Sequence, residues 1–175
     1  MIAMPGLADP YCFYRFTELI RCAPGVARAM ISLKAQYALR ALLALAKNDP
    51  DELSLIAEIA EAQRIPKKFL EQILLDLKHH GIVASRRGKL GGYSLLRPAD
   101  QITFGEVLRV IDGPLAPLPC LSRMAYRRCE GCVDERTCEI RAVMARVAEA
   151  TRSILDSVTI ADAMARPERV ALAVS

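Results

Sequence analysis

Four cysteines lie within nineteen residues of the sequence, with the spacing Cys120-x8-Cys129-x2-Cys132-x5-Cys138. Cysteine thiolates are soft ligands that bind zinc, copper or iron–sulfur clusters. Five arginines stand beside or between them: Arg123, Arg127, Arg128, Arg136 and Arg141. Nearby positive charge lowers the pKa of a thiol and favours the thiolate, which is the form that binds metal. We call residues 120–138 the cysteine loop and treat it as a candidate metal or redox site.

The spacing alone leaves three interpretations of the cysteine loop open. An iron–sulfur cluster takes three or four thiolates from a loop. A structural zinc site usually has two C-x2-C pairs, and only Cys129 and Cys132 form such a pair. The third interpretation is a set of unligated thiols. Disulfides are disfavoured, because charged residues interrupt residues 1–30, so no export signal is expected and the chain is predicted to be cytoplasmic.

The positive charge of the chain is concentrated in one region. The formal net charge is +4, yet residues 64–97 contain eight lysines and arginines against two acidic residues. Such a concentration is typical of a surface that binds a polyanion, although an ordinary solvated surface gives the same count. No uncharged apolar run approaches the roughly 18 residues that span a bilayer, so no membrane partner is expected.

Three helices are predicted around the start of this basic region. The first follows a capping Ser32 and runs to about Lys47, and the second follows Ser54 and runs to about Gln63. The third begins at Pro66 and ends near His80, before Gly81. Its apolar residues recur with helical spacing, and its other face is polar and basic: Lys67, Lys68, Glu71, Gln72 and Lys78. A short connection between the second and third helices indicates a helix-turn-helix.

A β-hairpin is predicted directly after the third helix. Residues 82–85 and 93–96 have strand-forming composition, and the segment between them is basic and rich in glycine. This segment lacks the GxGxxG spacing of a nucleotide loop, and no helix opens after it. A hairpin in this place is the wing of a winged helix, where Arg86, Arg87 and Lys89 offer charge to phosphates. The alternative is a winged helix with a purely structural role.

The C-terminal half contains a short helix and a long one. Thr103 is a candidate cap for a helix over residues 104–111, which ends at Asp112-Gly113-Pro114. Residues 138–165 are predicted to form one long helix, because Ile140, Val147, Ile154 and Ala161 recur every seven residues. An apolar seam of this kind favours homodimerisation, and the alternative is packing against its own domain.

The motifs together resemble one family of bacterial winged-helix transcription regulators, the one that includes IscR, NsrR, RirA and CymR. The resemblance covers about 135 residues from Met30 to Met164 and leaves residues 1–29 outside. The matching segments are SLKAQYALRAL (32–42), LIAEIA (55–60), FLEQIL (69–74), SRRG (85–88), GGYSL (91–95) and VIDGPL (110–115).

The resemblance implies a homodimer that binds double-stranded DNA, with the third helix in the major groove and the wing near the minor groove. The residues implied to contact DNA are Lys67, Lys68, Glu71, Gln72, Arg86, Arg87, Lys89, Gly91 and Gly92. Glutamate can accept a hydrogen bond from cytosine and glutamine can bridge adenine, which gives the helix a way to recognise bases.

The resemblance also implies an iron–sulfur cluster, of the 2Fe-2S or 4Fe-4S type. Members that carry one often use C-x5-C-x5-C, and Cys132-x5-Cys138 reproduces the second half of that pattern. Tyr126 stands where the first cysteine would be, and Arg141 stands where some members have a histidine ligand. A four-cysteine site of Cys120, Cys129, Cys132 and Cys138 is therefore expected.

The predicted fold is mainly α: a winged helix-turn-helix with a small β-hairpin wing and a long C-terminal dimerisation helix. Residues 1–29 are expected to be a poorly ordered extension, 30–98 the DNA-binding domain, 99–137 the linker helix and sensor loop, 138–165 the dimerisation helix and 166–175 a tail. The predicted function is cluster-dependent transcriptional regulation that senses redox state, iron or nitric oxide; the alternative is a metal-free repressor that responds to thiol chemistry or a partner protein. An enzyme with a small-molecule substrate is not expected, because a cysteine nucleophile needs a histidine and the only two, His79 and His80, lie on the predicted DNA-binding helix.

Overall fold

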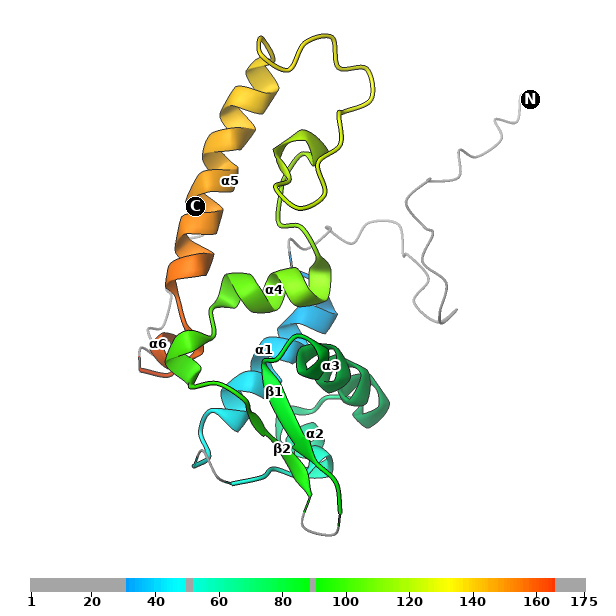
Figure 1. The fold of residues 1–175 in the computed structure, drawn as a ribbon, viewed down its shortest axis with the longest axis vertical. Helices are drawn as coiled ribbons and strands as arrows, with labels where there is room; N and C mark the ends of the chain where they lie inside the picture. Colours follow the sequence, from blue (N-terminus) through cyan, green and yellow to red (C-terminus); the bar gives the residue numbers. More distant parts are fainter. Residues whose placement is uncertain (1–30, 50–51, 89–90, 166–175) are drawn as a thin grey trace, which may run out of the picture. The chain divides into compact units, whose positions relative to one another are not determined.

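The computed structural model describes residues 31–49, 52–88 and 91–165. The predicted N-terminal extension, the predicted tail and Lys89 lie outside the described residues. The elements in chain order are α1 (Leu33–Leu45), α2 (Ile56–Gln63), α3 (Lys67–His79), β1 (Val83–Arg86), β2 (Gly92–Leu95), η1 (Ala99–Gln101), α4 (Phe104–Asp112), η2 (Pro119–Leu121), α5 (Glu139–Ser157) and α6 (Ile160–Ala165). This mainly helical order with one antiparallel hairpin confirms the predicted fold class (Figure 1).

Helix α1 is the central element of the core. Ser32 caps it as predicted, because the Ser32 hydroxyl accepts a hydrogen bond from the backbone N–H of Ala35 at 3.0 Å. Six of its thirteen residues are buried: Ala35, Ala38, Leu39, Ala41, Leu42 and Leu45. The helix contacts α2, α3, α4 and α6, so the small alanines on its surface allow several helices to pack closely around it.

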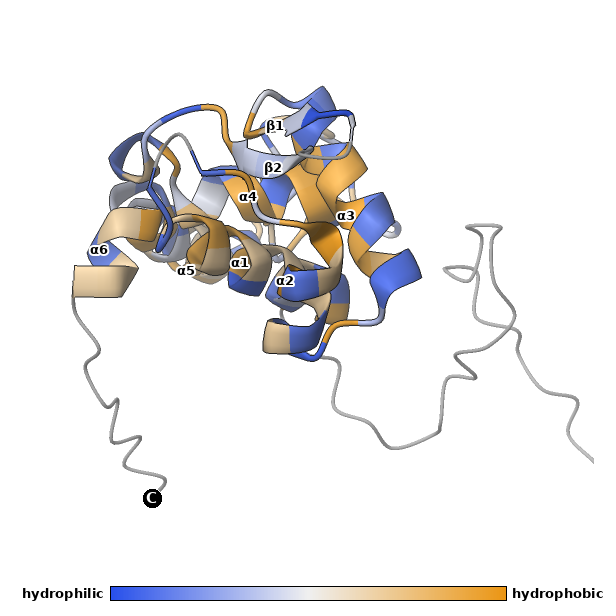
Figure 2. Ribbon diagram, turned by 90° about the horizontal axis from the view of Figure 1, so that it is seen from below, coloured by the Kyte–Doolittle hydropathy of each residue, from blue (hydrophilic) through white to orange (hydrophobic). Residues whose placement is uncertain are grey.

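Helices α2 and α3 form the predicted helix-turn-helix. The Glu58 carboxylate accepts a hydrogen bond from the Leu55 N–H at 3.1 Å and so fixes the start of α2, one residue later than expected. The turn passes through Arg64, which has φ 51°, and α3 begins directly after Pro66. Leu70, Ile73, Leu74 and Leu77 are fully buried, which confirms the predicted inner face of α3. Hydrophobic and hydrophilic residues alternate along its ribbon accordingly (Figure 2).

The hairpin after α3 is the predicted wing, with strands shifted by one residue from the expected bounds. Gly81, at φ 69°, ends the helix in a left-handed conformation, and β1 pairs antiparallel with β2 so that Val83 faces Leu95 and Arg86 faces Gly92. Ser54 adds an isolated bridge on the other side of β2, because it exchanges two backbone hydrogen bonds of 2.9 Å with Tyr93. The Lys78 ammonium donates to the Ser85 hydroxyl at 2.7 Å, which ties the wing to α3.

Helix α4 follows the hairpin and precedes the cysteine loop. Thr103 caps it as predicted, because its hydroxyl accepts a hydrogen bond from the Glu106 N–H at 3.2 Å. The helix packs against α1 and α3 on one side and against α5 on the other (Figure 1). The cysteine loop then runs from α4 to α5, with the short turn η2 near its start.

The prediction of one helix across residues 138–165 is wrong. The long helix α5 ends at Ser157, Val158 is extended, and a separate short helix α6 begins at Ile160. The break is held by the segment at the start of α4, because Phe104 N–H donates to the Val158 carbonyl at 3.0 Å and Ile160 N–H donates to the Ile102 carbonyl at 2.9 Å. Ile160 is fully buried there. The end of the heptad pattern therefore packs on its own domain rather than continuing the seam.

Candidate functional site

The outer face of α3 is the first candidate site. Lys67, Lys68, Glu71 and Gln72 are all exposed, as the sequence predicts for residues that contact DNA. The Gln72 amide donates a hydrogen bond to the Asp76 carboxylate at 3.1 Å. Asp76 also forms an ion pair of 2.7 Å with Lys34 of α1. The carboxylate that accepts the Gln72 hydrogen bond is therefore itself fixed by a contact with α1.

The wing supplies the basic part of the same surface. Arg86 and Arg87 are exposed, and Lys89 lies outside the described residues. The two glycines predicted to approach DNA have a packing reason as well. Gly91 is buried against the backbone of Arg86–Gly88, and a Cβ on Gly92 would lie 2.6 Å from the Ser54 carbonyl oxygen. Their role at DNA stays a prediction.

The four cysteines of the cysteine loop line one pocket of about 440 Å³. Cys120 lies in η2 and is only 5% exposed, whereas Cys129, Cys132 and Cys138 are half-buried. Cys129 and Cys132 are joined by a turn in which Cys132 N–H donates to the Cys129 carbonyl at 3.2 Å. Cys138 caps α5, and its sulfur accepts from the Arg141 N–H at 3.4 Å. We call this cavity the thiol pocket.

The thiols are close but are not arranged as a ligand set. Among residues 31–49, 52–88 and 91–165, no three His, Cys, Asp or Glu side chains form a group that could hold a metal ion. The donor chemistry nevertheless fits an iron–sulfur cluster, since four soft sulfurs and the partly buried guanidinium of Arg141 line one pocket. The residues that would hold a cluster are the four predicted ones.

Charged groups around the thiol pocket act on its sulfurs in opposite directions. Burial raises the pKa of the Cys120 thiol, and the neighbouring Cys129 thiol raises it further. The Arg141 guanidinium lowers the pKa of Cys120, in opposition to these two effects. The pocket therefore contains both a buried, protonation-prone sulfur and a positive charge that stabilises negative sulfur.

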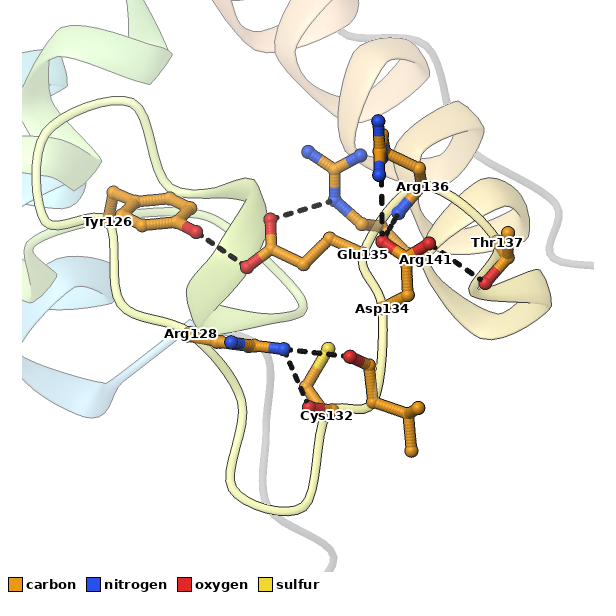
Figure 3. A network of polar contacts seen from close by, with 9 residues as sticks. Tyr126, Arg128, Cys132, Asp134, Glu135, Arg136, Thr137 and Arg141 are labelled. Atoms are coloured by element: carbon orange, nitrogen blue, oxygen red, sulfur yellow. Dashed lines mark hydrogen bonds and ion pairs between the residues drawn. The ribbon is translucent and has the colours of Figure 1, made fainter.

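A polar network shapes the cysteine loop (Figure 3). The Arg128 guanidinium donates to the carbonyl oxygens of Cys132 and Val133, each at 2.9 Å, and the Cys132 thiol raises the pKa of Arg128. The Tyr126 hydroxyl donates to Glu135 at 2.5 Å, and this carboxylate raises the pKa of Tyr126. From the sequence, the arginines are expected only to lower the pKa of the thiols by their charge. The hydrogen bonds that Arg128 donates to the loop backbone could not be predicted, because no local motif marks them.

The helix-turn-helix, its wing and the exposed polar row of α3 define a winged-helix DNA-binding protein. The family model described as "Rrf2: Iron-dependent Transcriptional regulator" matches residues 31–166. The chain therefore belongs to the Rrf2 family of DNA-binding transcription regulators. This confirms the resemblance that the sequence motifs carry.

Relatives agree with this assignment. An rrf2-like HTH-type transcriptional regulator of Rhodobacter capsulatus is 50% identical over 139 residues, covering 78% of this chain and 93% of that protein. The structure of CymR, the global cysteine regulator of B. subtilis, is 30% identical with a TM-score of 0.64, covering 77% of this chain and 95% of that one. The T. potens IscR structure is 27% identical with a TM-score of 0.60, covering 77% and 85%.

The names of the relatives also test the expectation that the chain is not an enzyme. The Rhodobacter capsulatus relative, CymR and IscR are named as HTH-type transcriptional regulators, which confirms that the chain is a regulator rather than an enzyme. Within the described residues, no helix combines the length and the apolar character that crossing a membrane requires.

Proposed function

We propose that this chain is a homodimeric transcription regulator whose operator binding is controlled by an iron–sulfur cluster at Cys120, Cys129, Cys132 and Cys138. The observation that carries the proposal is that all four thiols line one pocket, in the loop that connects α4 to α5. The bound cluster would supply a redox-active and chemically labile centre. The protein's part is to bind it, to shield it and to pass its state to the DNA-binding domain.

The DNA-contacting surface in this proposal consists of the exposed row of α3 and the wing arginines. Helix α3 would enter the major groove, where Glu71 and Gln72 face base edges and Lys67 and Lys68 face phosphates. Arg86 and Arg87 would contact the neighbouring backbone or minor groove. Two such surfaces in a dimer would meet half-sites about one turn of DNA apart, so their relative orientation decides the affinity.

The path from the thiol pocket to this surface runs through α4 and α5. Residues 113–119 connect the C-terminal end of α4 to the cysteine loop, and the loop leads directly into α5, because Cys138 is the cap of α5. Arg109 of α4 pairs with Asp156 of α5 at 2.6 Å. A change in the loop on gain or loss of the cluster would therefore shift the equilibrium between two placements of the DNA-binding domains.

Anaerobic purification tests the proposal. We expect visible absorbance together with bound iron and sulfide after reconstitution, and operator affinity that differs between the loaded and metal-free protein. Replacing Cys132 and Cys138 by alanine is expected to abolish the absorbance while helical content, measured by circular dichroism, is retained. The sequence has two further cysteines, Cys12 and Cys22, in the predicted N-terminal extension. The matched control replaces these two by alanine and leaves the loop intact. A colourless, iron-free wild type after reconstitution contradicts the proposal.

A metal-free thiol switch is the second candidate function. It is favoured by the position of Cys120, which is buried beside the Cys129 thiol, and by the absence of an assembled ligand group among the described residues. The similarity to CymR, a cysteine regulator, points the same way. Iron-free protein that binds its operator only when its thiols are reduced would select this function.

A further inference from the structure

One buried donor at the thiol pocket has no hydrogen-bond partner. The Nε atom of Arg141 is the only buried side-chain nitrogen or oxygen in the described residues that lacks one. Buried polar groups are normally paired, because an unpaired donor has lost its water without gaining an acceptor. The position of Arg141 Nε therefore indicates a missing acceptor.

The nearest carboxylate does not serve as this acceptor. Glu135 Oε2 lies 3.9 Å from Arg141 Nε, which is close enough for an ion pair and too far for a hydrogen bond. The other oxygen of Glu135 already accepts the Tyr126 hydroxyl at 2.5 Å, and this bond holds the carboxylate where it is (Figure 3). The acceptor for Nε must come from another direction.

The thiol pocket is lined by Arg141 itself. Arg141 lines it together with all four cysteines, and the backbone N–H of the same residue already donates to the Cys138 sulfur at 3.4 Å. Four thiolates around an iron–sulfur core leave the cluster with a net negative charge, and its sulfurs accept hydrogen bonds. A charged donor that lines the pocket from the first turn of α5 has the chemistry to match it.

We propose that Arg141 is a positioning residue that donates a hydrogen bond from Nε to a sulfur of the bound cluster and raises the cluster's reduction potential. This inference rests on the proposed function. Reduction adds one electron to the cluster and breaks no bond to a cysteine, so the reduced form is the more negative one. A fixed positive charge and a hydrogen bond stabilise that form more than the oxidised form.

The test compares Arg141→Gln, Arg141→Lys and, as a matched control, Arg136→Gln. Arg136 is 92% exposed, lies on the cysteine loop five residues before Arg141 and does not line the thiol pocket. Each reconstituted protein is assayed for iron and sulfide and for folding by circular dichroism. The midpoint potential is then measured by anaerobic titration with dithionite, followed by visible absorbance.

We expect wild type and Arg136→Gln to have the same midpoint potential. The midpoint potential of Arg141→Gln should be more negative, and that of Arg141→Lys should lie between those of wild type and Arg141→Gln. Arg141→Gln should also lose iron faster to a chelator. An unchanged potential in iron-loaded Arg141→Gln overturns the inference, and so does full restoration by lysine, which has charge but no Nε of this geometry. If Arg141→Gln cannot hold iron, Arg141→Lys is compared with wild type alone. A midpoint potential in Arg141→Lys that is more negative than that of wild type supports the inference, and a potential equal to that of wild type overturns it. An iron-free wild type instead overturns the proposed function, and it is recognised because every variant is then iron-free.

Discussion

Arg109 of α4 and Asp156 of α5 form an ion pair in which guanidinium Nη2 and carboxylate Oδ1 are 2.6 Å apart. The two side chains are 28% and 39% exposed, so solvent screens the pair only in part. They are 47 positions apart in the chain, on either side of the cysteine loop. The pair therefore closes the segment that contains the four cysteines and fixes one helix against the other.

Asp156→Asn is expected to weaken the link between the cysteine loop and DNA binding more than it weakens the fold. A partly exposed pair contributes at most about 1 kcal/mol to the free energy of unfolding, so the loss of stability should be small. The ratio of operator Kd values between cluster-loaded and metal-free protein should move toward one. Fluorescence anisotropy with labelled operator measures this ratio.

The control for this prediction is Arg152→Gln, which breaks the 2.6 Å pair with Glu149 inside α5 and leaves the Arg109–Asp156 pair in place. It should change the ratio little. A ratio in Asp156→Asn equal to that of wild type would show that the ion pair does not couple the two regions.

Arg87→Ala is expected to weaken binding to all DNA sequences alike. Arg87 is exposed directly after the end of β1, where a guanidinium can neutralise one phosphate. Each phosphate contact contributes about 0.9 to the slope of log K against log salt on duplex DNA, so the slope should fall by about that amount. Titrations at several salt concentrations measure the slope, with Arg136→Ala as the control. An unchanged slope would assign Arg87 to a role other than phosphate contact.

Gln72→Ala is expected to relax the sequence preference at one base pair. In the free protein the Gln72 amide is bonded to Asp76, which Lys34 holds from α1, so the side chain is already oriented before DNA arrives. A good bidentate contact to a base contributes about 1–3 kcal/mol of discrimination. Binding to a library of operator variants measures this directly. Lys68→Ala should instead weaken every variant equally, and the same uniform loss in Gln72→Ala would contradict a base contact.

The DNA-binding domain could be predicted from the sequence because its signals are local. The spacing of Leu70, Ile73, Leu74 and Leu77 fixes the inner face of α3, and Gly81 marks its end through the left-handed conformation that it adopts. The bridge between Ser54 and Tyr93 could not be predicted, since it joins residues far apart in the chain. The same holds for the tight packing of Gly92 against Ser54.

The sequence does not predict the break between α5 and α6, because the heptad pattern of apolar residues continues through it. Ala161 continues the pattern, yet the buried Ile160 packs on the domain core. A local signal was present: Thr159 and Asp162 have the spacing of a capping box, and the structure shows the Asp162 N–H donating to the Thr159 hydroxyl at 3.0 Å. Backbone hydrogen bonds with residues 102–104 complete the break. They join residues far apart in the chain, so the seven-residue period does not reveal them.

The sequence predicts that the four cysteines lie close together, but it does not predict how the cysteine loop is arranged around them. The count and spacing of thiols indicated that they would meet, and all four do line one pocket. The burial of Cys120 depends on the turn η2, and the separate tasks of Arg128 and Arg141 depend on how the loop folds back on α5. Neither follows from a one-dimensional spacing of charged residues.

Val147→Glu is expected to convert a dimer into a monomer. Helix α5 exposes four large apolar side chains, Ile140, Val143, Val147 and Ile154, with fractions of 66%, 58%, 47% and 62%. Ile140, Val147 and Ile154 follow the seven-residue period of a helix-pairing seam, and a buried glutamate in such a seam would have lost its water without a partner. Sedimentation equilibrium gives the oligomeric state, and operator affinity should fall with it, because a monomer meets only one half-site. Ala142→Glu, an exposed position off the seam, is the control and should stay dimeric. A Val147→Glu variant that remains dimeric at the wild-type association constant would show that a different surface joins the two chains.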